Sequence, residues 1–432
     1  MKAKLRRLIK KVLPEDIYNK LVLPKHYFLA MVAVVKNGFP ARGMKVIGVT
    51  GTNGKTTTSV MLASILNEAG LKTGLITSQL LQIDGEMIET TVEYTTPSAD
   101  ITQSYIKKMR QAGVTHLVLE TASHGLAQKR VFGIPYFGAV FTNLTPDHLD
   151  YHKTMENYAA TKRQLFKKAK NFSVLNADSD WYNFMNIKSK DQTTSYSFTQ
   201  KGADISVDSF ELAPSSAKME FSTSEGKIKT SLQFTGKYNV ANAMAAAGAA
   251  LKLGISTDVI AKGLANLKPV SGRMETIDEG QDFAVYIDNA HTGDSLSNLI
   301  GALQDVAGKS QVIVLCGADG DRGPDRRIPL GEAVGKIAPS KVIVSDQEPY
   351  SDNPDELRAD VIKGLENSEY SDYIDGGDRT KAIKLALKQA KKGDIVLIAG
   401  IGAQPWRGMG EGKEGEVEWD ERTVVRKAIK SL

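Results

Sequence analysis

The chain has 432 residues, of which 41% are hydrophobic and 24% charged, and its formal net charge is +5. One hydrophobic core rarely organises so long a chain, so we expect two or three domains. The single cysteine, Cys316, excludes an intramolecular disulfide and is typical of the reducing cytosol; its apolar surroundings predict a buried thiol at a strand end. The longest apolar stretch, residues 27–35, is far shorter than the ~20 residues that a membrane span needs. We therefore expect a cytoplasmic protein, and the modest charge gives no reason to expect a nucleic-acid partner.

Residues 1–43 predict a short basic helical segment that ends at glycine and proline residues between positions 38 and 43. Its first dozen residues contain six Lys and Arg, as in the first part of a signal peptide. The apolar region of a signal peptide does not follow, because residues 14–16 are a proline and two acids. We expect a solvated helix face here, and the alternative is contact with an anionic membrane surface or an acidic partner.

Strand and helix patterns alternate through the middle of the chain. Residues 44–50 form an apolar run that glycines follow, and residues 55–69 have apolar side chains at helical spacing. Further strands are predicted at residues 71–78, 116–121, 139–143 and 173–176. This order predicts a mostly parallel sheet with helices on both faces. Short alternating stretches between residues 204 and 234 predict a small antiparallel appendage.

A second α/β series begins near Phe283. Its strands are predicted at residues 285–288, 311–316, 341–345 and 394–399, and residues 269–272 are the predicted hinge before it. The predicted domains are the short basic helical segment 1–43, a central P-loop ATPase domain 44–270 with the antiparallel appendage, and a C-terminal Rossmann-like α/β domain 271–432.

A glycine-rich loop lies between the first predicted strand and helix of the central domain. Residues 48–57 read Gly-Val-Thr-Gly-Thr-Asn-Gly-Lys-Thr-Thr, with Val49 where the usual phosphate-loop pattern has its first glycine. Glycines let backbone N–H groups close on phosphate oxygens, and a helix N-terminus favours negative charge. Lys55 is then expected to pair with the β- and γ-phosphates and Thr56 to bind Mg²⁺. The alternative is a glycine-rich turn with an incidental lysine, but the strand–loop–helix order favours a nucleotide site. The expected nucleotide-binding residues are Gly51, Thr52, Asn53, Gly54, Lys55, Thr56 and Thr57.

Several motifs, collinear from about residue 44 to the C-terminus, resemble the Mur ligase family. They are residues 52–57, 120–126 with Arg130, 142–152 with Tyr158 and Lys162, 236–243, 272–275, 288–292, and 320–322 with Arg326 and Arg327. The resemblance is strongest to the UDP-N-acetylmuramoyl-tripeptide synthetase branch, the MurE type. The segment Thr95-Thr96-Pro97 and the run Asp-His-Leu-Asp-Tyr-His at residues 147–152 favour that branch.

The resemblance implies an ATP- and Mg²⁺-dependent ligase that forms ADP and makes an amide bond through an acyl-phosphate. Its substrates would be an amino acid and a muropeptide precursor of the cell wall, and we expect a monomer. Such an enzyme must neutralise phosphate charge and hold the reacting groups in line, and two metal ions can clamp the oxygens. The catalytic residues implied are Lys55, Glu120, His148 and Lys162. The metal ligands implied are Thr56, Glu120, His148 and Lys162.

Lys162 has a special role in the resembling family, where the lysine at this spacing is carbamylated and its new carboxylate helps to hold a metal. The alternative is a solvent-facing helix lysine, because Lys162-Arg163 and Lys167-Lys168 form a basic face. A strand-end Glu120 or a His148, taken singly, is more often a cap or surface residue.

The substrate-binding residues are implied by the same motifs. Thr95, Thr96, Pro97, Ser123 and Arg130 match positions that grip the muropeptide, and the planar fork of an arginine suits an anionic substrate. The residues that match positions around adenine, ribose and phosphates are Asn239, Asn242, Arg273, Asp288 and His291. Two asparagines three apart on a helix share a face, and either could instead be a helix cap.

The sequence departs from the family pattern in two places. Only about 43 residues precede the phosphate-loop strand, whereas the branch normally has a full first domain that holds the uridine nucleotide. Either uridine is held differently, or the acceptor is a recycled or lipid-linked muropeptide.

The second departure concerns the incoming amino acid. Members that add diaminopimelate read its far end with Asp-Asn-Pro-Arg, but here Tyr350 stands where the arginine would be, and residues 400–404 lack the family's later glutamate. The predicted amino-acid contacts are Asp346, Tyr350 and Gln404. Glu348, Asp352 and Asp355 favour a cationic side chain such as lysine, unless they are only solvated loop acids.

Two other functions stay open. A ligase of the folylpolyglutamate-synthase type would share the mechanism, although Thr95-Thr96-Pro97 argues against a folate substrate. A nucleotide-binding subunit that has lost catalysis is the second, and the intact set Lys55, Thr56, Glu120, His148 and Lys162 argues against it.

Overall fold

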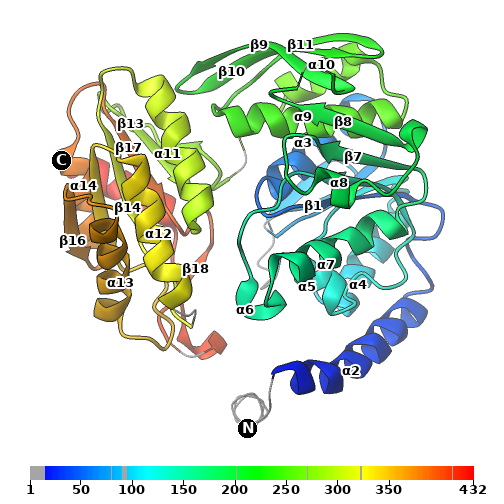
Figure 1. The fold of residues 1–432 in the computed structure, drawn as a ribbon, viewed down its shortest axis with the longest axis horizontal. Helices are drawn as coiled ribbons and strands as arrows, with labels where there is room; N and C mark the ends of the chain where they lie inside the picture. Colours follow the sequence, from blue (N-terminus) through cyan, green and yellow to red (C-terminus); the bar gives the residue numbers. More distant parts are fainter. Residues whose placement is uncertain are drawn as a thin grey trace. The chain divides into compact units, whose positions relative to one another are not determined.

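The structure is a computed structural model that describes residues 15–432 except Gln79, residues 90–94, Lys201, Val270, residues 322–323 and Glu411. The basic residues 2–11, for which a solvated helix face was predicted and a membrane contact was the alternative, lie outside the described residues, as do Val270 of the predicted hinge and Arg322. The chain groups into two compact units, one up to Ile205 with residues 245–263, the other of residues 206–244 and 264–432 (Figure 1). The predicted domain boundaries at residues 43 and 270 stay predictions.

The first unit is built on a largely parallel sheet. Its strands are β1 (Lys45–Thr50), β2 (Thr73–Ile76), β3 (Leu80–Ile83), β4 (Glu86–Glu89), β5 (His116–Glu120), β6 (Tyr136–Phe141), β7 (Phe172–Asn176) and β8 (Thr193–Ser197), in the order β8-β7-β6-β1-β5-β2-β3-β4. β1 pairs in parallel with both β5 and β6, and its residues are almost all buried, as expected of a strand covered on both faces. The antiparallel hairpin β3–β4 was not predicted from the sequence, and β6 begins three residues earlier than the predicted strand.

Helices connect these strands. They are α2 (Glu15–Lys36), α3 (Lys55–Glu68), α4 (Ala99–Gln111), α5 (Ser123–Ala127), α6 (Leu149–His152), α7 (Met155–Lys168) and α8 (Tyr182–Met185), with a 3₁₀ turn at Lys190–Gln192. The core on one face of the sheet includes Tyr136 and Phe141 from β6 and Phe166 from α7. The rings of Phe141 and Phe166 lie edge to face with centroids 6.3 Å apart. α9 (Lys237–Lys252) and α10 (Thr257–Ala265) each have residues in both units.

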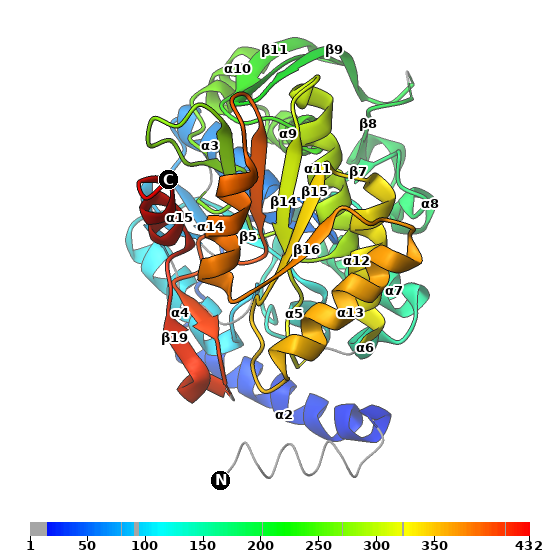
Figure 2. The ribbon, with the colours of Figure 1, turned by 90° about the vertical axis from the view of Figure 1, so that its left-hand side faces the viewer.

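The second unit has its own six-stranded sheet, in the order β12-β13-β17-β14-β15-β16. Figure 2 labels its neighbouring strands β14, β15 and β16. Its strands are β12 (Glu275–Thr276), β13 (Ala284–Asp288), β14 (Val312–Cys316), β15 (Lys341–Ser345), β16 (Tyr373–Gly377) and β17 (Ile395–Ala399). Neighbouring strands pair in parallel, except that β12 is antiparallel to β13. Cys316 is buried at the end of β14, as predicted.

Helices cover both faces of this second sheet. One core contains residues of α11 (Gly293–Ala307), α12 (Pro324–Ile337) and α13 (Pro354–Asn367), and the other contains residues of α14 (Arg379–Gln389) and α15 (Glu421–Ile429). The unit also holds a hairpin of β18 (Trp406–Gly408) and β19 (Glu416–Glu418), joined by a 3₁₀ turn at Gly412–Gly415. The antiparallel appendage is β9 (Ile205–Ala213), β10 (Ser216–Thr223) and β11 (Gly226–Leu232). The predicted α/β fold class, with its antiparallel appendage and second α/β sheet, is confirmed.

A fully buried ion pair joins α14 and α15 to the sheet of the second unit. The Arg379 side chain donates from Nε to Glu421 Oε1 at 3.1 Å, from Nη1 to Ser345 Oγ at 2.8 Å and from Nη2 to the carbonyl of Ala399 at 2.7 Å. Trp419 Nε1 donates to the other oxygen of Glu421 at 2.7 Å. Burial of a charged pair is tolerated only when its donors and acceptors are paired in this way.

We expect Arg379→Ala to lower the free energy of unfolding of the second unit by about 3–5 kcal/mol, because Glu421 would keep a buried charge without its partner. Urea denaturation followed by circular dichroism measures the loss. The matched control is Arg422→Ala, which removes a partly exposed pair with Asp420 and should cost less than about 1 kcal/mol. Equal losses in the two variants would contradict the importance of the buried pair.

Candidate active site

The loop between β1 and α3 approaches the end of β6 so closely that it requires glycine. A Cβ atom on Gly51 would lie 1.8 Å from Thr142 Oγ1. Gly54 precedes α3 with φ +79°, a left-handed conformation that favours glycine. Thr142 Oγ1 donates to the carbonyl of Asn53 at 2.6 Å, which fixes the loop against β6. The free N–H groups at the start of α3 give this end of the helix a positive potential, which favours the binding of phosphate.

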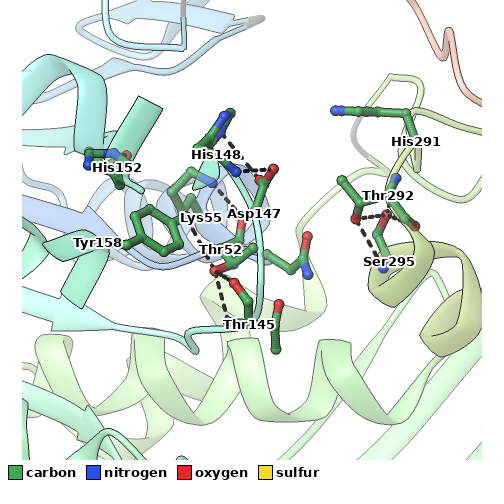
Figure 3. A network of polar contacts seen from close by, with 12 residues as sticks. Thr52, Lys55, Thr145, Asp147, His148, His152, Tyr158, His291, Thr292 and Ser295 are labelled. Carbon is green, nitrogen blue, oxygen red and sulfur yellow. Dashed lines mark hydrogen bonds and ion pairs between the residues drawn. The ribbon is translucent and has the colours of Figure 1, made fainter. Parts of the chain in front are cut away.

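Thr52 fastens the loop to the segment that follows β6. Its Oγ1 accepts from the N–H of Thr145 at 3.0 Å, lies 3.4 Å from the hydroxyl of Tyr158, and its N–H donates to the carbonyl of Asn143 at 2.9 Å (Figure 3). Lys55 Nζ donates to the carbonyl of Thr52 at 2.7 Å. The lysine amine is thus held beside the loop backbone, where a nucleotide's phosphates would bind.

A carboxylate and a hydroxyl meet next to the loop. Glu120 ends β5 and is buried, and its Oε2 accepts from Thr56 Oγ1 at 2.9 Å and from the N–H of Ser78 at 3.2 Å. Val49 and Glu120 are register partners in the β1–β5 pair, so the parallel strands bring the loop and the carboxylate to one edge. Hydroxyl and carboxylate oxygens are ligands that suit Mg²⁺, which usually keeps waters and substrate phosphates as further ligands. The pair Thr56–Glu120 therefore fits the metal implied by the sequence. Within the described residues, no group of three or more His, Cys, Asp and Glu side chains is placed to hold a metal without such further ligands.

Lys162 lies in the interior, and the alternative of a solvent-facing lysine is wrong. It is on α7, a helix whose N-cap Thr154 accepts from the N–H of Asn157, and its side chain is buried. Its Nζ donates to the carbonyl of Gly51 at 2.6 Å and lies 4.5 Å from the ring centroid of Tyr158. The amine therefore contacts the phosphate loop directly.

Burial lowers the pKa of the Lys162 amine well below its ordinary value of 10.5. Desolvation is the main cause and the positive charge of Lys55 adds to it, while the negative charges of Asp147 and Glu120 act in the opposite direction. This environment favours an uncharged amine, which is a nucleophile.

His148 is the N-cap of α6 and has φ +53°, a strained conformation for a residue with a side chain. Asp147 accepts from the N–H of His148 at 2.8 Å and lies 3.3 Å from its Nε2 (Figure 3). The ring of His148 packs edge to face on that of His124, with centroids 4.7 Å apart. Nearby, His152 Nε2 and Ser123 Oγ are 2.9 Å apart. His124, Asp147 and His152 lie within the resembling motifs but were given no role from the sequence.

Among the residues predicted to bind a muropeptide, Thr96 and Arg130 are joined by a hydrogen bond. Thr96 Oγ1 donates to the carbonyl of Glu120 at 3.0 Å and accepts from the N–H of Ala122 at 2.9 Å. Arg130 donates from Nη1 to the carbonyl of Thr96 at 2.8 Å and from Nε to Gln128 Oε1 at 3.0 Å. Thr96, its neighbour Pro97 and Ser123 are buried, and Thr95 is half-buried. The structure thus brings this set to the end of β5, beside Glu120.

The residues predicted around the adenosine lie in the second unit. Asp288 ends β13 and accepts from the N–H groups of Met274 at 2.8 Å and Ala290 at 2.7 Å. Burial raises the pKa of Asp288, and the nearby charge of Arg273 opposes that shift. His291 is exposed, and its Nδ1 lies 2.7 Å from the carbonyl of Asn289.

The two asparagines of α9 are buried and contact each other. Asn239 Nδ2 donates to the carbonyl of Thr235 at 2.6 Å, and Asn242 Nδ2 donates to Asn239 Oδ1 at 3.3 Å. The neighbouring Tyr238 has its pKa raised by burial and by the negative charge of Asp288. The first turn of α9 therefore lies near the end of β13, as a shared nucleotide site in this unit would require.

The predicted amino-acid contacts surround Glu348. This carboxylate accepts through Oε1 from Gln404 Nε2 at 2.7 Å and from the N–H of Gly408 at 3.0 Å. Burial, and then the negative charge of Asp319, raise the pKa of Glu348 to about 7. Tyr350 has φ +46°, and its ring lies where a side chain on Gly408 would be. Tyr350 and Glu348 thus both contact Gly408 of β18.

The other acids of this region pair with arginines. Arg358 pairs with Asp346 and with Asp355, and Arg327 pairs with Asp352. Asp346, predicted to contact the amino acid, therefore already has a cationic partner, which the sequence did not reveal. Asp352 and Asp355 pair with arginines of the chain itself. Of the three acids predicted to bind a cationic side chain, Glu348 therefore remains the candidate.

Two family models match the chain: the Mur ligase middle domain over residues 49–250, and the Mur ligase, glutamate ligase domain over residues 272–402. The UDP-N-acetylmuramoyl-L-alanyl-D-glutamate–2,6-diaminopimelate ligase of Geobacillus kaustophilus is 36% identical over 423 residues, which are 96% of this chain and 85% of that protein. The protein of the same name from Nostoc is 37% identical over 406 residues, with 93% and 80% covered.

Solved structures of Mur ligases and of related ligases have a similar fold. That of a UDP-N-acetylmuramoyl-L-alanyl-D-glutamate–2,6-diaminopimelate ligase has a TM-score of 0.62 at 28% identity, covering 90% of this chain and 79% of that one. Folylpolyglutamate synthase of Mycobacterium tuberculosis has a TM-score of 0.70 at 17% identity, covering 88% and 96%, a likeness that concerns the fold alone. On the identity and coverage of its relatives, this chain belongs to the Mur ligase family.

Proposed function

We propose that this protein is an ATP-dependent, ADP-forming ligase that adds an amino acid to a UDP-N-acetylmuramoyl-peptide type of peptidoglycan precursor. The observation that carries the proposal is the edge of the first sheet, where the phosphate loop, the pair Thr56–Glu120 and the buried Lys162 lie in direct contact. The family relationship supplies the reaction class. We take the enzyme to be a cytoplasmic monomer without a nucleic-acid partner.

The reaction needs two steps, and the residues divide between them. The acceptor carboxylate attacks the γ-phosphorus of ATP, which releases ADP and leaves an acyl-phosphate; the amine then attacks the acyl carbon and phosphate leaves. Lys55 and the loop N–H groups bind and neutralise the phosphates in the first step. Thr56, Glu120 and His148 are the proposed Mg²⁺ ligands, and the metal supplies charge neutralisation on the transferred phosphoryl group.

Thr95, Thr96, Pro97, Ser123 and Arg130 are the proposed muropeptide contacts. Because Thr96 uses its hydroxyl to join Glu120 to Ala122, we assign it the positioning of this segment. Ser123 and Arg130 are the proposed acceptor contacts, since an arginine fork recognises carboxylate or phosphate when it exchanges its contacts with Thr96 and Gln128 for the substrate. Asn239, Asn242, Arg273, Asp288 and His291 are the proposed adenosine and phosphate contacts of the second unit.

We also propose that Lys162 is carbamylated. Addition of its neutral amine to CO₂ forms an N–C bond and releases one proton, so the lowered pKa of Lys162 favours the reaction. The product is an anion beside the positive charge of Lys55, which disfavours the ammonium form but stabilises a carboxylate. The remaining N–H can still donate to the carbonyl of Gly51. The carbamate would then add an oxygen ligand for Mg²⁺.

ADP release, measured across a panel of amino acids with UDP-muramoyl-dipeptide as acceptor, tests the function. We expect release that needs both substrates and a product heavier by one residue. Turnover only with a muropeptide that lacks the nucleotide would favour the recycled or lipid-linked acceptor. Turnover with a folate would favour the folylpolyglutamate-synthase alternative. ATP hydrolysis that no acceptor and no amino acid stimulates would contradict a ligase.

We expect Lys162→Ala to abolish turnover, because the oxygen ligand of the carbamate is lost. Excess bicarbonate or a short carboxylic acid should restore part of the activity by supplying that oxygen. The control is Lys167→Ala, an exposed lysine on the same helix, which should keep full activity. A ¹³C signal of a carbamate after growth or incubation with labelled bicarbonate should appear in wild type and not in Lys162→Ala. Full activity of Lys162→Ala would refute the carbamate.

For the incoming amino acid, we propose that Glu348 binds the ammonium group of a cationic side chain such as that of lysine. Because the pKa of Glu348 is about 7, its carboxylate is charged above this pH, and KM for lysine should fall as pH rises through about 7. Glu348→Gln should raise KM about tenfold or more, with a smaller effect on kcat, and remove this pH step. The control Asp355→Asn removes an acid that pairs with Arg358 and should leave KM unchanged.

Tyr350→Arg extends the same test, since it places the family's arginine in the loop between β15 and α13, beside Gly408, and should raise the use of diaminopimelate. Unchanged KM for lysine in Glu348→Gln, together with no gain for diaminopimelate in Tyr350→Arg, would refute this assignment.

A further inference from the structure

Helix α2 has a broad apolar face that the rest of the described structure leaves exposed. Among the described residues, thirteen large hydrophobic side chains are exposed, and eight of them lie between residues 23 and 39. They are Leu23, Tyr27, Phe28, Leu29, Met31, Val32, Val35 and Phe39. Contiguous exposed apolar side chains of this kind mark an interaction surface, whereas single ones are ordinary.

The opposite face of α2 is already used. Ala30, Ala33 and Val34 are buried. Tyr27 is partly exposed, and one side of its ring lies edge to face on Phe132 with centroids 4.8 Å apart. The helix runs beside α4 in both views (Figures 1 and 2). α2 is therefore apolar on two sides, a pattern typical of a helix that is covered all round. The described residues of this unit cover one of these sides and leave the other exposed.

The charge of the residues around α2 indicates what kind of partner would bind its exposed apolar face. Residues 1–45 contain eleven Lys and Arg against two Asp and Glu, a net charge of +9, whereas the whole chain has only +5, so the remaining residues sum to −4. Between residues 17 and 67 there is no acidic residue. Lys25 and Lys36 are exposed and, eleven residues apart, fall on nearly the same line along the helix, beside Val32. Apolar side chains bordered by cations match the acyl boundary and the phosphates of an anionic bilayer.

We propose that α2 docks on the surface of an anionic phospholipid membrane. Phe28, Val32 and Val35 enter the boundary between headgroups and acyl chains, and Lys25 and Lys36 contact lipid phosphates. No helix among the described residues is long and apolar enough to cross a bilayer, so the helix lies in the interface rather than spanning it. The proposal rests on α2 and its charge, not on the reaction.

Co-sedimentation of the full chain with vesicles of phosphatidylglycerol and phosphatidylethanolamine in equal parts tests this surface. Wild type should bind these vesicles, bind phosphatidylcholine vesicles at least about tenfold more weakly, and lose binding as salt rises. The combined variant Phe28→Glu, Val32→Glu, Val35→Glu should bind at least about tenfold more weakly than wild type.

The matched control changes three exposed apolar residues elsewhere, Ile88→Glu, Met409→Glu and Val417→Glu, and should bind as wild type does. Circular dichroism establishes that both variants are folded. Failure of wild type to bind anionic vesicles overturns the proposal, and so does equal loss in the two variants. A wild-type dimer in sedimentation velocity that the α2 variant converts to monomers, without vesicle binding, would assign the face to a second copy of the chain.

Discussion

A lysine amine buried against the phosphate loop is the constraint on which the first unit depends. The Lys162 amine contacts the carbonyl of Gly51 and is removed from water, so its charged form is disfavoured where an exposed lysine would be charged. Such a group is tolerated because it keeps a hydrogen bond and because Asp147 and Glu120 offset part of the desolvation. The close packing has a second effect: the loop has no room for a side chain at Gly51, since a Cβ there would overlap Thr142. The chemistry and the shape of the loop are therefore set by the same contacts.

The topology of the sheet explains why residues far apart in sequence meet at this lysine. The loop follows β1, Glu120 ends β5 and Thr142 follows β6, and β1 lies between β5 and β6. Parallel strands present their carboxyl ends at one edge, so three successive connections deliver a loop, a carboxylate and a hydroxyl to the same place. α7, which follows β6 after α6, then brings Lys162 back to that edge. In the second unit the same arrangement places Asp288 at the end of β13 and Glu348 beyond β15.

Local patterns made part of this predictable. The phosphate loop, the strand that ends at Glu120 and the fold class follow from short runs of apolar residues and glycines, which need no knowledge of distant contacts. The burial of Lys162 could not be derived from its basic neighbours, because it depends on which side of α7 faces the sheet. The pairing of Asp346 with Arg358 could not be predicted from the sequence either, since it depends on how α13 packs against the loop that follows β15. The hairpin β3–β4 was missed because its strands of four residues give little alternation to detect. The roles of the site residues remain predictions, whereas family and fold are established.

The buried pair of Arg379 and Glu421 has a consequence for the synthesis of the protein. The two residues are 42 positions apart in the chain. At translation rates of roughly 5–20 residues per second, the arginine is made about 2–8 s before its carboxylate exists. During that interval β14, β15 and α14 are present, but closing them would bury a guanidinium without its counter-charge. The buried pair of the second unit can therefore form only after α15 has been synthesised.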